Sequence, residues 1–189
     1  EVLDMIDPNK KMILVTMHRR ENQGDPMRRV FKVMREVVES HPDIEIIYPV
    51  HLNPVVQEAA DAILGHHKRI HLIDPLDVVD FHNLAARSYF IMTDSGGVQE
   101  EAPSLGKPVL VLRDTTERPE GVEAGTLKLV GTDPTMVKTA MLQLLDDPTE
   151  YRRMAEAKNP YGDGHASRRI LDAILYDFGK IQNRPAPFK

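Results

Sequence analysis

Short apolar runs alternate with longer amphipathic segments along most of the chain. The runs are continuous rather than alternating, as in parallel strands that are buried on both faces. They predict six strands, at residues 12–16, 44–50, 69–73, 89–93, 108–112 and 127–130. The pattern therefore predicts a sheet with both faces covered.

Helical spacing of apolar residues fills the gaps between these runs. It predicts helices at residues 25–40, 54–64, from 77 onward, and 97–105, where Gly106 ends the helix. Only helices follow the last strand, at about residues 133–145, 150–156 and 166–181. The final helix carries Ile170, Ile174, Leu175 and Phe178, and we expect it to pack against the rest of the domain.

Strands that alternate with helices through short loops predict an α/β fold with a doubly wound, mostly parallel six-stranded sheet and C-terminal helices. Residues 11–189 are expected to form one domain. Residues 1–10 contain no strand or helix pattern and do not start with methionine. We interpret them as the remnant of an interdomain connector.

Polar clusters follow four of the predicted strands. In doubly wound sheets, ligands bind beyond the carboxyl ends of the strands. We therefore expect these clusters to meet at one rim, although they are scattered in the sequence: His18-Arg19-Arg20, His51, Ser95-Gly96-Gly97 and Arg113 to Glu120.

The Ser95-Gly96-Gly97 turn lies between a predicted strand and a helix. Unpaired backbone N–H groups at such a helix start favour an anion such as phosphate. An equally good interpretation is an ordinary helix cap, in which Ser95 accepts a hydrogen bond and the glycines relax the backbone.

The loop from His18 to Asn22 contains two arginines beside an imidazole. Guanidinium groups suit phosphate oxygens, and the imidazole can donate to phosphate or move a proton. The alternative is a solvated loop in which the arginines pair with Glu21. His51 is by itself more typical of a structural histidine, and the remaining histidines are interpreted as structural. No histidine pair four residues apart has the partnering glutamate of a catalytic metal site.

Two further segments carry candidate ligand-binding groups. Glu101 follows Gly97 by one helical turn, where a carboxylate can accept from ribose hydroxyls; alternatively, it only complements the helix dipole. The loop from Arg113 to Glu120 is rich in charges and hydroxyls, which suit a sugar or a phosphate. Its alternative is a solvated surface loop.

Net charge and composition exclude several classes of binding partner. The net charge is −5 and the pI is about 5.9, which argues against nucleic-acid binding. The chain lacks cysteine and any apolar run long enough for a membrane helix. We expect a soluble cytoplasmic protein with no nucleic-acid or membrane partner.

Four motifs resemble those of the bacterial non-hydrolysing UDP-N-acetylglucosamine 2-epimerases. They are Thr16-Met17-His18-Arg19-Arg20-Glu21-Asn22, residues 48–54 (YPVHLNP), residues 94–103 (DSGGVQEEAP) and residues 113–120 (RDTTERPE). Their order and spacing cover nearly the whole chain, so the resemblance is specific.

The resemblance implies a GT-B fold, of which this chain is only the C-terminal Rossmann-like half. It implies interconversion of UDP-N-acetylglucosamine and UDP-N-acetylmannosamine, through elimination of UDP to 2-acetamidoglucal and its re-addition. No cofactor and no metal are implied. The implied partners are UDP, the UDP-N-acetylhexosamines, the missing N-terminal domain and, at full length, a second copy in a homodimer.

The resemblance also implies roles for individual residues. His18 matches the active-site histidine near the departing diphosphate, and Ser95, Gly96 and Gly97 match the diphosphate-binding turn. Glu101 matches the ribose-binding carboxylate, and Phe81 matches a position whose backbone reads the uracil. Arg113, Thr116 and Glu117 match the loop that approaches the sugar and phosphates. Arg19 and His51 match positions that line an allosteric UDP-N-acetylglucosamine site.

The catalytic carboxylates of the family lie in the missing domain. We therefore expect this chain to fold and to bind UDP weakly, but not to epimerise alone. The alternatives are one half of a hydrolysing epimerase or of a GT-B glycosyltransferase, and a stand-alone nucleotide-binding module.

Overall fold

A computed structural model describes residues 5–186 of the chain. Its centre is a six-stranded, all-parallel sheet in the order β3-β2-β1-β4-β5-β6. The strands are β1 (Lys11–Thr16), β2 (Ile44–Pro49), β3 (Ile70–Ile73), β4 (Phe90–Thr93), β5 (Val109–Val111) and β6 (Leu127–Leu129). This order confirms the doubly wound prediction and places the topological switch between β1 and β4.

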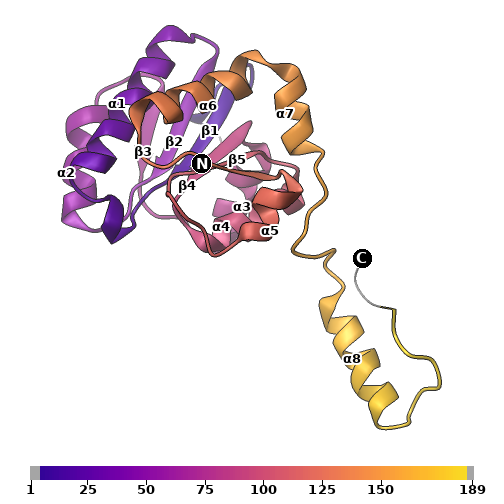
Figure 1. The fold of residues 1–189 in the computed structure, drawn as a ribbon. Helices are drawn as coiled ribbons and strands as arrows, with labels where there is room; N and C mark the ends of the chain where they lie inside the picture. The colour runs from indigo at the N-terminus through magenta and orange to yellow at the C-terminus, as the bar shows by residue number, and fades with distance from the viewer. Residues whose placement is uncertain (1–4, 187–189) are drawn as a thin grey trace.

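Helices cover both faces of the sheet (Figure 1). One face packs against α1 (Asp25–Ser40), α2 (Pro54–Leu64) and α6 (Pro134–Asp146), and the other against α3 (Val78–Arg87) and α4 (Gly96–Glu101). The connections include η2 (Arg20–Asn22), η3 (Ala102–Leu105) and α5 (Pro119–Ala124), and α7 (Pro148–Ala155) follows α6.

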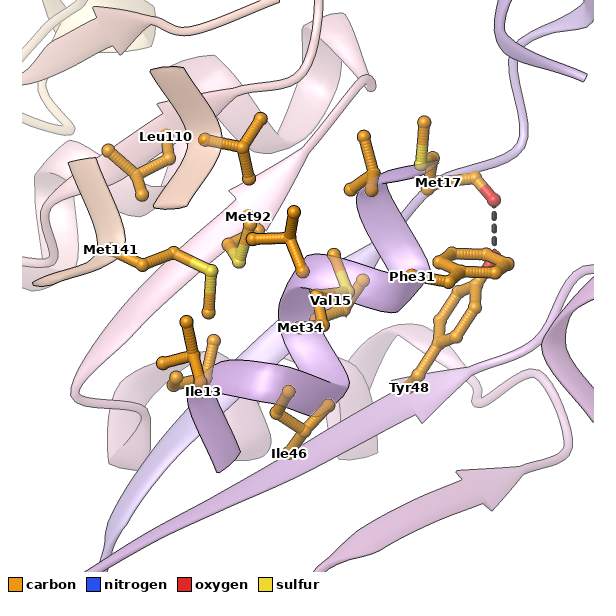
Figure 2. Packing of buried hydrophobic residues seen from close by; sticks show 14 of the residues in the cluster. Ile13, Val15, Met17, Phe31, Met34, Ile46, Tyr48, Met92, Leu110 and Met141 are labelled. Carbon is orange, nitrogen blue, oxygen red and sulfur yellow. Dashed lines mark hydrogen bonds between the residues drawn. The ribbon is translucent and has the colours of Figure 1, made fainter. Parts of the chain in front are cut away.

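The larger core lies between β1, β2 and β4 and helices α1, α2 and α6. Figure 2 shows Phe31 and Met34 of α1 reaching toward Tyr48 and Val15 of the sheet. Helix α1 buries seven side chains at helical spacing, which are Met27, Val30, Phe31, Val33, Met34, Val37 and Val38. The apolar stripe predicted from the sequence is thus the face that fixes α1 on the sheet.

The predicted boundaries agree with the structure to within about two residues, except that the last helix ends at Asp177 rather than at about residue 181, and there are two further local differences. The helix expected from Gly97 to Leu105 is divided into α4 and η3, although it ends as predicted with Gly106 in the left-handed conformation. The segment expected to be a loop from Arg113 to Glu120 leads into α5, whose first residue is Pro119. Pro103 accounts for the first difference, because it donates no hydrogen bond to continue the α-helical pattern.

The last helix, α8 (Ala166–Asp177), corrects the expectation that it packs against the domain. It projects from the body at the end of an extended segment (Figure 1), and none of its twelve residues is buried. Ile170, Leu171 and Ile174 are each at least half exposed. The helical periodicity therefore predicts the helix correctly, but none of its apolar side chains is buried among residues 5–186.

Residues 5–10 of the predicted connector lie against the first strands, while residues 1–4 are outside the described residues. Glu45 of β2 is almost fully buried, and its carboxylate accepts from the Asp7 backbone N–H at 3.3 Å and from Lys10 Nζ at 2.8 Å. The end of this segment is therefore tied to the sheet by a partly buried charge pair. Within the described part of the chain, no helix is long and apolar enough to span a membrane.

Candidate ligand site at the strand ends

The loops after β1 and β4 meet at the topological switch of the sheet. The Asp94 backbone N–H donates to the Thr16 carbonyl at 3.1 Å, and the Thr16 and Thr93 hydroxyls lie 2.6 Å apart. The polar groups that follow these adjacent parallel strands are therefore held side by side, as the strand-end argument predicted.

Asp94 organises the loop after β1 from a position with no solvent exposure. Its carboxylate accepts from the backbone N–H of His18 at 3.0 Å, from that of Arg19 at 2.8 Å and from the Asn22 side-chain amide at 3.0 Å. Asn22 also donates to the Leu112 carbonyl at 3.1 Å. One carboxylate thus fixes the backbone that carries His18 and Arg19, and Asn22 links it to the end of β5.

Two guanidinium groups flank the Gly-Gly turn. A methyl group built on Gly96 would lie 3.9 Å from Nη2 of Arg19 and 3.9 Å from Nη2 of Arg118. Arg19 is held in place by its Nε, which donates to the Asp94 carbonyl at 3.2 Å. Gly96 therefore keeps open a space between two cations, which suits an anion with several oxygens.

Ser95 precedes α4 at the N-cap position, but its side chain makes no capping hydrogen bond. Its backbone N–H donates instead to the Thr93 hydroxyl at 2.9 Å. Neither Gly96 nor Gly97 has a positive φ, so backbone relaxation does not require the two glycines. These observations remove both parts of the plain-cap interpretation and favour the anion-holding one.

His18 and His51 form a parallel stack at the mouth of a cleft of about 230 Å³. Their ring centroids are 5.2 Å apart with an interplanar angle of 7°. The cleft is also lined by Ser95, Val98 and Phe81 of α3. A larger hollow of about 520 Å³ lies between α2 and β3, but the charged groups described above do not converge on it.

Glu101 lies at the end of α4, beside the turn. Its Oε2 is 3.2 Å from Nε2 of His82 on α3, and its Oε1 would lie 4.0 Å from a methyl group on Gly97. His82 was interpreted from the sequence as a merely structural histidine. The structure shows instead that it contacts the carboxylate expected at the ribose.

The loop after β5 is organised by side-chain ion pairs. Arg113 is nearly buried and donates to Glu21 at 2.9 Å and to Glu117 at 2.6 Å, while Arg118 pairs with Glu100. The Arg113 guanidinium lowers the pKa of Glu117 to about 2, and the two carboxylates raise the pKa of Arg113. The Thr116 hydroxyl donates to buried Gln99 at 2.5 Å.

The structure brings His18, Arg19, His51, Ser95 and Glu101 to one rim, together with Phe81, Gly96 and Gly97. Arg113, Thr116 and Glu117 lie in the neighbouring loop and contact protein groups rather than open space. Glu21 pairs with Arg113, not with the arginines next to it in the sequence. Residues 5–186 contain no cluster of three or more potential ligands for a metal ion.

Sequence reasoning overlooked Asp94, Asn22 and Arg118. Asp94 stands inside the quoted Asp-Ser-Gly-Gly motif, and a carboxylate directly after a buried strand was a usable signal. Asn22 and Arg118 lie in loops that the sequence analysis singles out, but their individual roles could not be predicted because they depend on contacts with residues 72 and 18 positions away.

Residues 1–175 match the family model described as UDP-N-acetylglucosamine 2-epimerase. The UDP-N-acetylglucosamine 2-epimerase of Bacillus subtilis (strain 168) is 61% identical over 187 residues, which are 99% of this chain and 49% of that protein. The enzyme of the same name from Escherichia coli (strain K12) is 55% identical over 169 residues, covering 89% and 45%. The chain spans about half the length of the curated relatives it matches.

Solved structures are similar over the same extent. The S. aureus MnaA-UDP co-structure superposes with a TM-score of 0.91 at 57% identity, covering 96% of this chain and 50% of that one. A UDP-GlcNAc 2-epimerase from Neisseria meningitidis bound to UDP-GlcNAc gives a TM-score of 0.88 at 44% identity, covering 93% and 47%.

Proposed function

The chain belongs to the UDP-N-acetylglucosamine 2-epimerase family, and on that premise we propose that it is the UDP-binding half of an enzyme that interconverts UDP-N-acetylglucosamine and UDP-N-acetylmannosamine. The observation that carries this proposal is the open space over Gly96 between the guanidinium groups of Arg19 and Arg118. Relatives of known structure are described with UDP or UDP-GlcNAc bound, which supports a diphosphate as the anion.

The diphosphate lies over the Ser95-Gly96-Gly97 turn in this proposal. Arg19 and Arg118 contact its oxygens from two sides, and the Ser95 hydroxyl, which makes no capping bond, donates to it. Bidentate guanidinium–phosphate contacts are among the stronger charge-assisted hydrogen bonds. The turn therefore stabilises the charge that UDP carries when it leaves the sugar.

The nucleoside occupies the cleft lined by Phe81 and Val98. The Phe81 backbone reads the uracil, and Glu101 accepts from the vicinal hydroxyls of the ribose. The contact between Glu101 and His82 orients that carboxylate toward the turn. Arg113, Thr116 and Glu117 approach the sugar and phosphates from the loop after β5.

The reaction breaks two bonds of the sugar. Loss of the C2 proton and of UDP from C1 gives 2-acetamidoglucal, and re-addition of UDP with a proton on the other face of C2 gives the epimer. His18 lies beside the departing diphosphate and stabilises its charge. The carboxylates that move the C2 proton belong, in this proposal, to the other half of the protein.

Helix α8 supports the presence of that other half. Its exposed apolar residues include Ile170, Leu171 and Ile174, and such a face is typical of a helix that is covered by another surface. The relatives are about twice as long as this chain. We propose that α8 packs on the additional domain, and that Ile174→Ser weakens association with that domain while leaving the thermal midpoint of this chain unchanged.

The remaining features of the proposal follow from the family resemblance. Arg19 and His51 line a second, allosteric UDP-N-acetylglucosamine site; since Arg19 lies at Gly96 and His51 stacks on His18, that site is continuous with the first. The full-length protein forms a homodimer in the cytoplasm. Sedimentation of the full-length protein tests the dimer.

Calorimetric titration of this chain with UDP tests the site. We expect weak but measurable binding, and about tenfold weaker binding for Ser95→Ala and Glu101→Ala, since each removes a hydrogen bond to a charged or polar ligand group. Glu123→Ala, an exposed carboxylate on α5, is the matched control. A folded chain that does not bind UDP at about millimolar concentration would overturn the assignment.

Activity is tested by adding the separately produced N-terminal half and UDP-N-acetylglucosamine. A UDP-linked N-acetylmannosamine product supports the proposed epimerisation. Free N-acetylmannosamine would instead indicate a hydrolysing epimerase.

A further inference from the structure

Asp94 is a fully buried carboxylate to which the proposed mechanism gives no role. Besides its backbone and amide donors, its Oδ1 lies 3.4 Å from Nδ1 of His18. Among residues 5–186, His18 is the only basic side chain within ion-pair distance of this carboxylate. A buried carboxylate that faces one edge of an imidazole orients the ring and selects its tautomer.

The stacked ring of His51 has the opposite kind of partner at its Nδ1. Nδ1 of His51 accepts the backbone N–H of Asn53 at 3.0 Å, so the hydrogen of neutral His51 must be on Nε2. Nδ1 of His18 faces an acceptor, so the hydrogen of neutral His18 belongs on Nδ1. Two rings that stack at 5.2 Å therefore carry their hydrogens on different nitrogens.

We propose that Asp94 is the positioning residue of this site. Asp94 holds His18 with its ring hydrogen on Nδ1, and this leaves Nε2 as the proton acceptor toward the ligand. His51 beside it remains a donor through Nε2–H. The assignment of the rings stands on geometry alone; only the identity of the ligand, a nucleoside diphosphate, rests on the proposed function.

This arrangement predicts proton uptake when the diphosphate binds. Nε2 without hydrogen cannot donate to a phosphate oxygen, so His18 takes one proton from solvent and becomes an imidazolium, and no bond to the ligand forms or breaks. Stacked His51 is the other titratable group that faces this ring, and Arg19 follows His18 in the chain with its guanidinium near Gly96. Arg19 opposes the new charge, whereas Asp94 and the diphosphate flank and stabilise it.

The field of Asp94 also acts on Tyr48 of β2, which contacts the same loop. The Tyr48 hydroxyl donates to the Met17 carbonyl, one residue before His18. Burial raises the pKa of Tyr48, and the Asp94 carboxylate raises it further.

The ring assignment is tested without any ligand, by nitrogen-15 NMR of the histidine side chains at about pH 8, where histidines are largely neutral. We expect a pyrrole-type Nδ1 and a pyridine-type Nε2 for His18, and the reverse for His51. His18 with hydrogen on Nε2 in the wild-type chain would overturn the proposal.

Asp94→Asn tests the cause. The amide oxygen takes the place of Oδ2, which accepts from the Arg19 N–H and the Asn22 amide. The introduced NH2 group therefore faces His18 Nδ1 and moves the ring hydrogen to Nε2. The same exchange produces the wrong tautomer in a serine protease triad. Asp74→Asn, at an exposed position after β3, is the matched control and leaves both rings unchanged. Asn22→Ala, which removes a hydrogen bond but keeps the carboxylate, also leaves the tautomer unchanged.

Proton uptake is measured by UDP titration at about pH 8 in buffers of different ionisation enthalpy, because the phosphate groups are then fully ionised. We expect an uptake that approaches one proton per UDP for the wild type and for Asp74→Asn, and none for Asp94→Asn. Binding without uptake in the wild type would contradict the proposal. Absence of UDP binding would contradict the proposed function instead, while the ring assignment would still be decided by the spectra.

Discussion

The loops after β1 and β5 both carry charged residues to the same rim, but they are held in different ways. Backbone N–H groups of the β1 loop converge on Asp94, which has no solvent exposure. The β5 loop is held by the pairs of Arg113 with Glu117 and of Arg118 with Glu100, in which the glutamates are about half exposed. One loop is fixed from inside the fold, and the other from its surface.

The difference separates a rigid from an adjustable half of the site. A buried carboxylate that loses a donor is left poorly solvated, whereas an exposed ion pair exchanges with water at little cost. Arg118 already has a carboxylate partner at its Nε, which competes with a phosphate for the charge of the guanidinium. We infer that the β1 loop is preorganised for the anion and that the β5 loop rearranges around it.

The largest effect is expected for Asn22→Ala, in the β1 loop. Asn22 donates to both Asp94 and the Leu112 carbonyl, so its removal leaves two buried acceptors short of a donor and lowers the free energy of unfolding by about 2 kcal/mol. Urea denaturation measures this change. Asn83→Ala on the exposed side of α3 is the control, and an equal loss in both variants would erase the contrast between the loops.

Gly96→Ala is expected to separate stability from binding. The added methyl group meets no atom closer than 3.9 Å, so the free energy of unfolding stays the same or rises by less than about 1 kcal/mol. UDP affinity falls by at least about tenfold, or about 1.4 kcal/mol, since the methyl group fills the space between the two guanidinium groups.

Gly97→Ala provides the matched comparison for Gly96→Ala. Its methyl group would contact Ser95 and Glu101 rather than the arginines, so a smaller loss of UDP affinity is expected. Equal losses in calorimetric titrations of the two variants would show that the space between Arg19 and Arg118 is not where the anion binds.

A smaller effect of opposite sign is expected for Glu100→Gln, in the β5 loop. The change releases Arg118 from its exposed ion pair, so UDP affinity rises about two- to fivefold, within the energy of a surface pair. The same change in an Arg118→Ala background has no effect. An increase that persists without Arg118 would show that Glu100 acts by general repulsion.

The sheet could be predicted from the sequence because each strand is a continuous apolar run, and parallel strands joined by helices have few possible arrangements. Asp77 as the cap of α3 and Gly106 as the end of η3 were also readable, since both roles depend on local backbone geometry. The position of α8 was not, because an amphipathic pattern predicts a covered face but not what covers it.

The candidate site was predicted as a set of strand ends, not as a set of contacts. The meeting of His18, Ser95 and Arg19 followed from topology, whereas the link from Asn22 to Asp94 and the pair of Arg118 with Glu100 depend on side-chain packing. Arg113 shows the limit most clearly. Its place at the ligand stays a prediction, whereas its ion pairs with Glu21 and Glu117 depend on side-chain packing that the sequence does not reveal.

The smallest effect is expected for Glu117→Gln, and it depends on pH. Arg113 lowers the pKa of Glu117 from 4.5 to about 2, so the pair stabilises the fold fully above about pH 4.5 and loses its effect as the pH falls toward 2. The wild type should have a slightly higher urea midpoint than Glu117→Gln at neutral pH, and the difference should vanish toward pH 2. Exposure keeps this difference small. A large or pH-independent difference would mean that the β5 loop, like the β1 loop, is fixed from inside the fold.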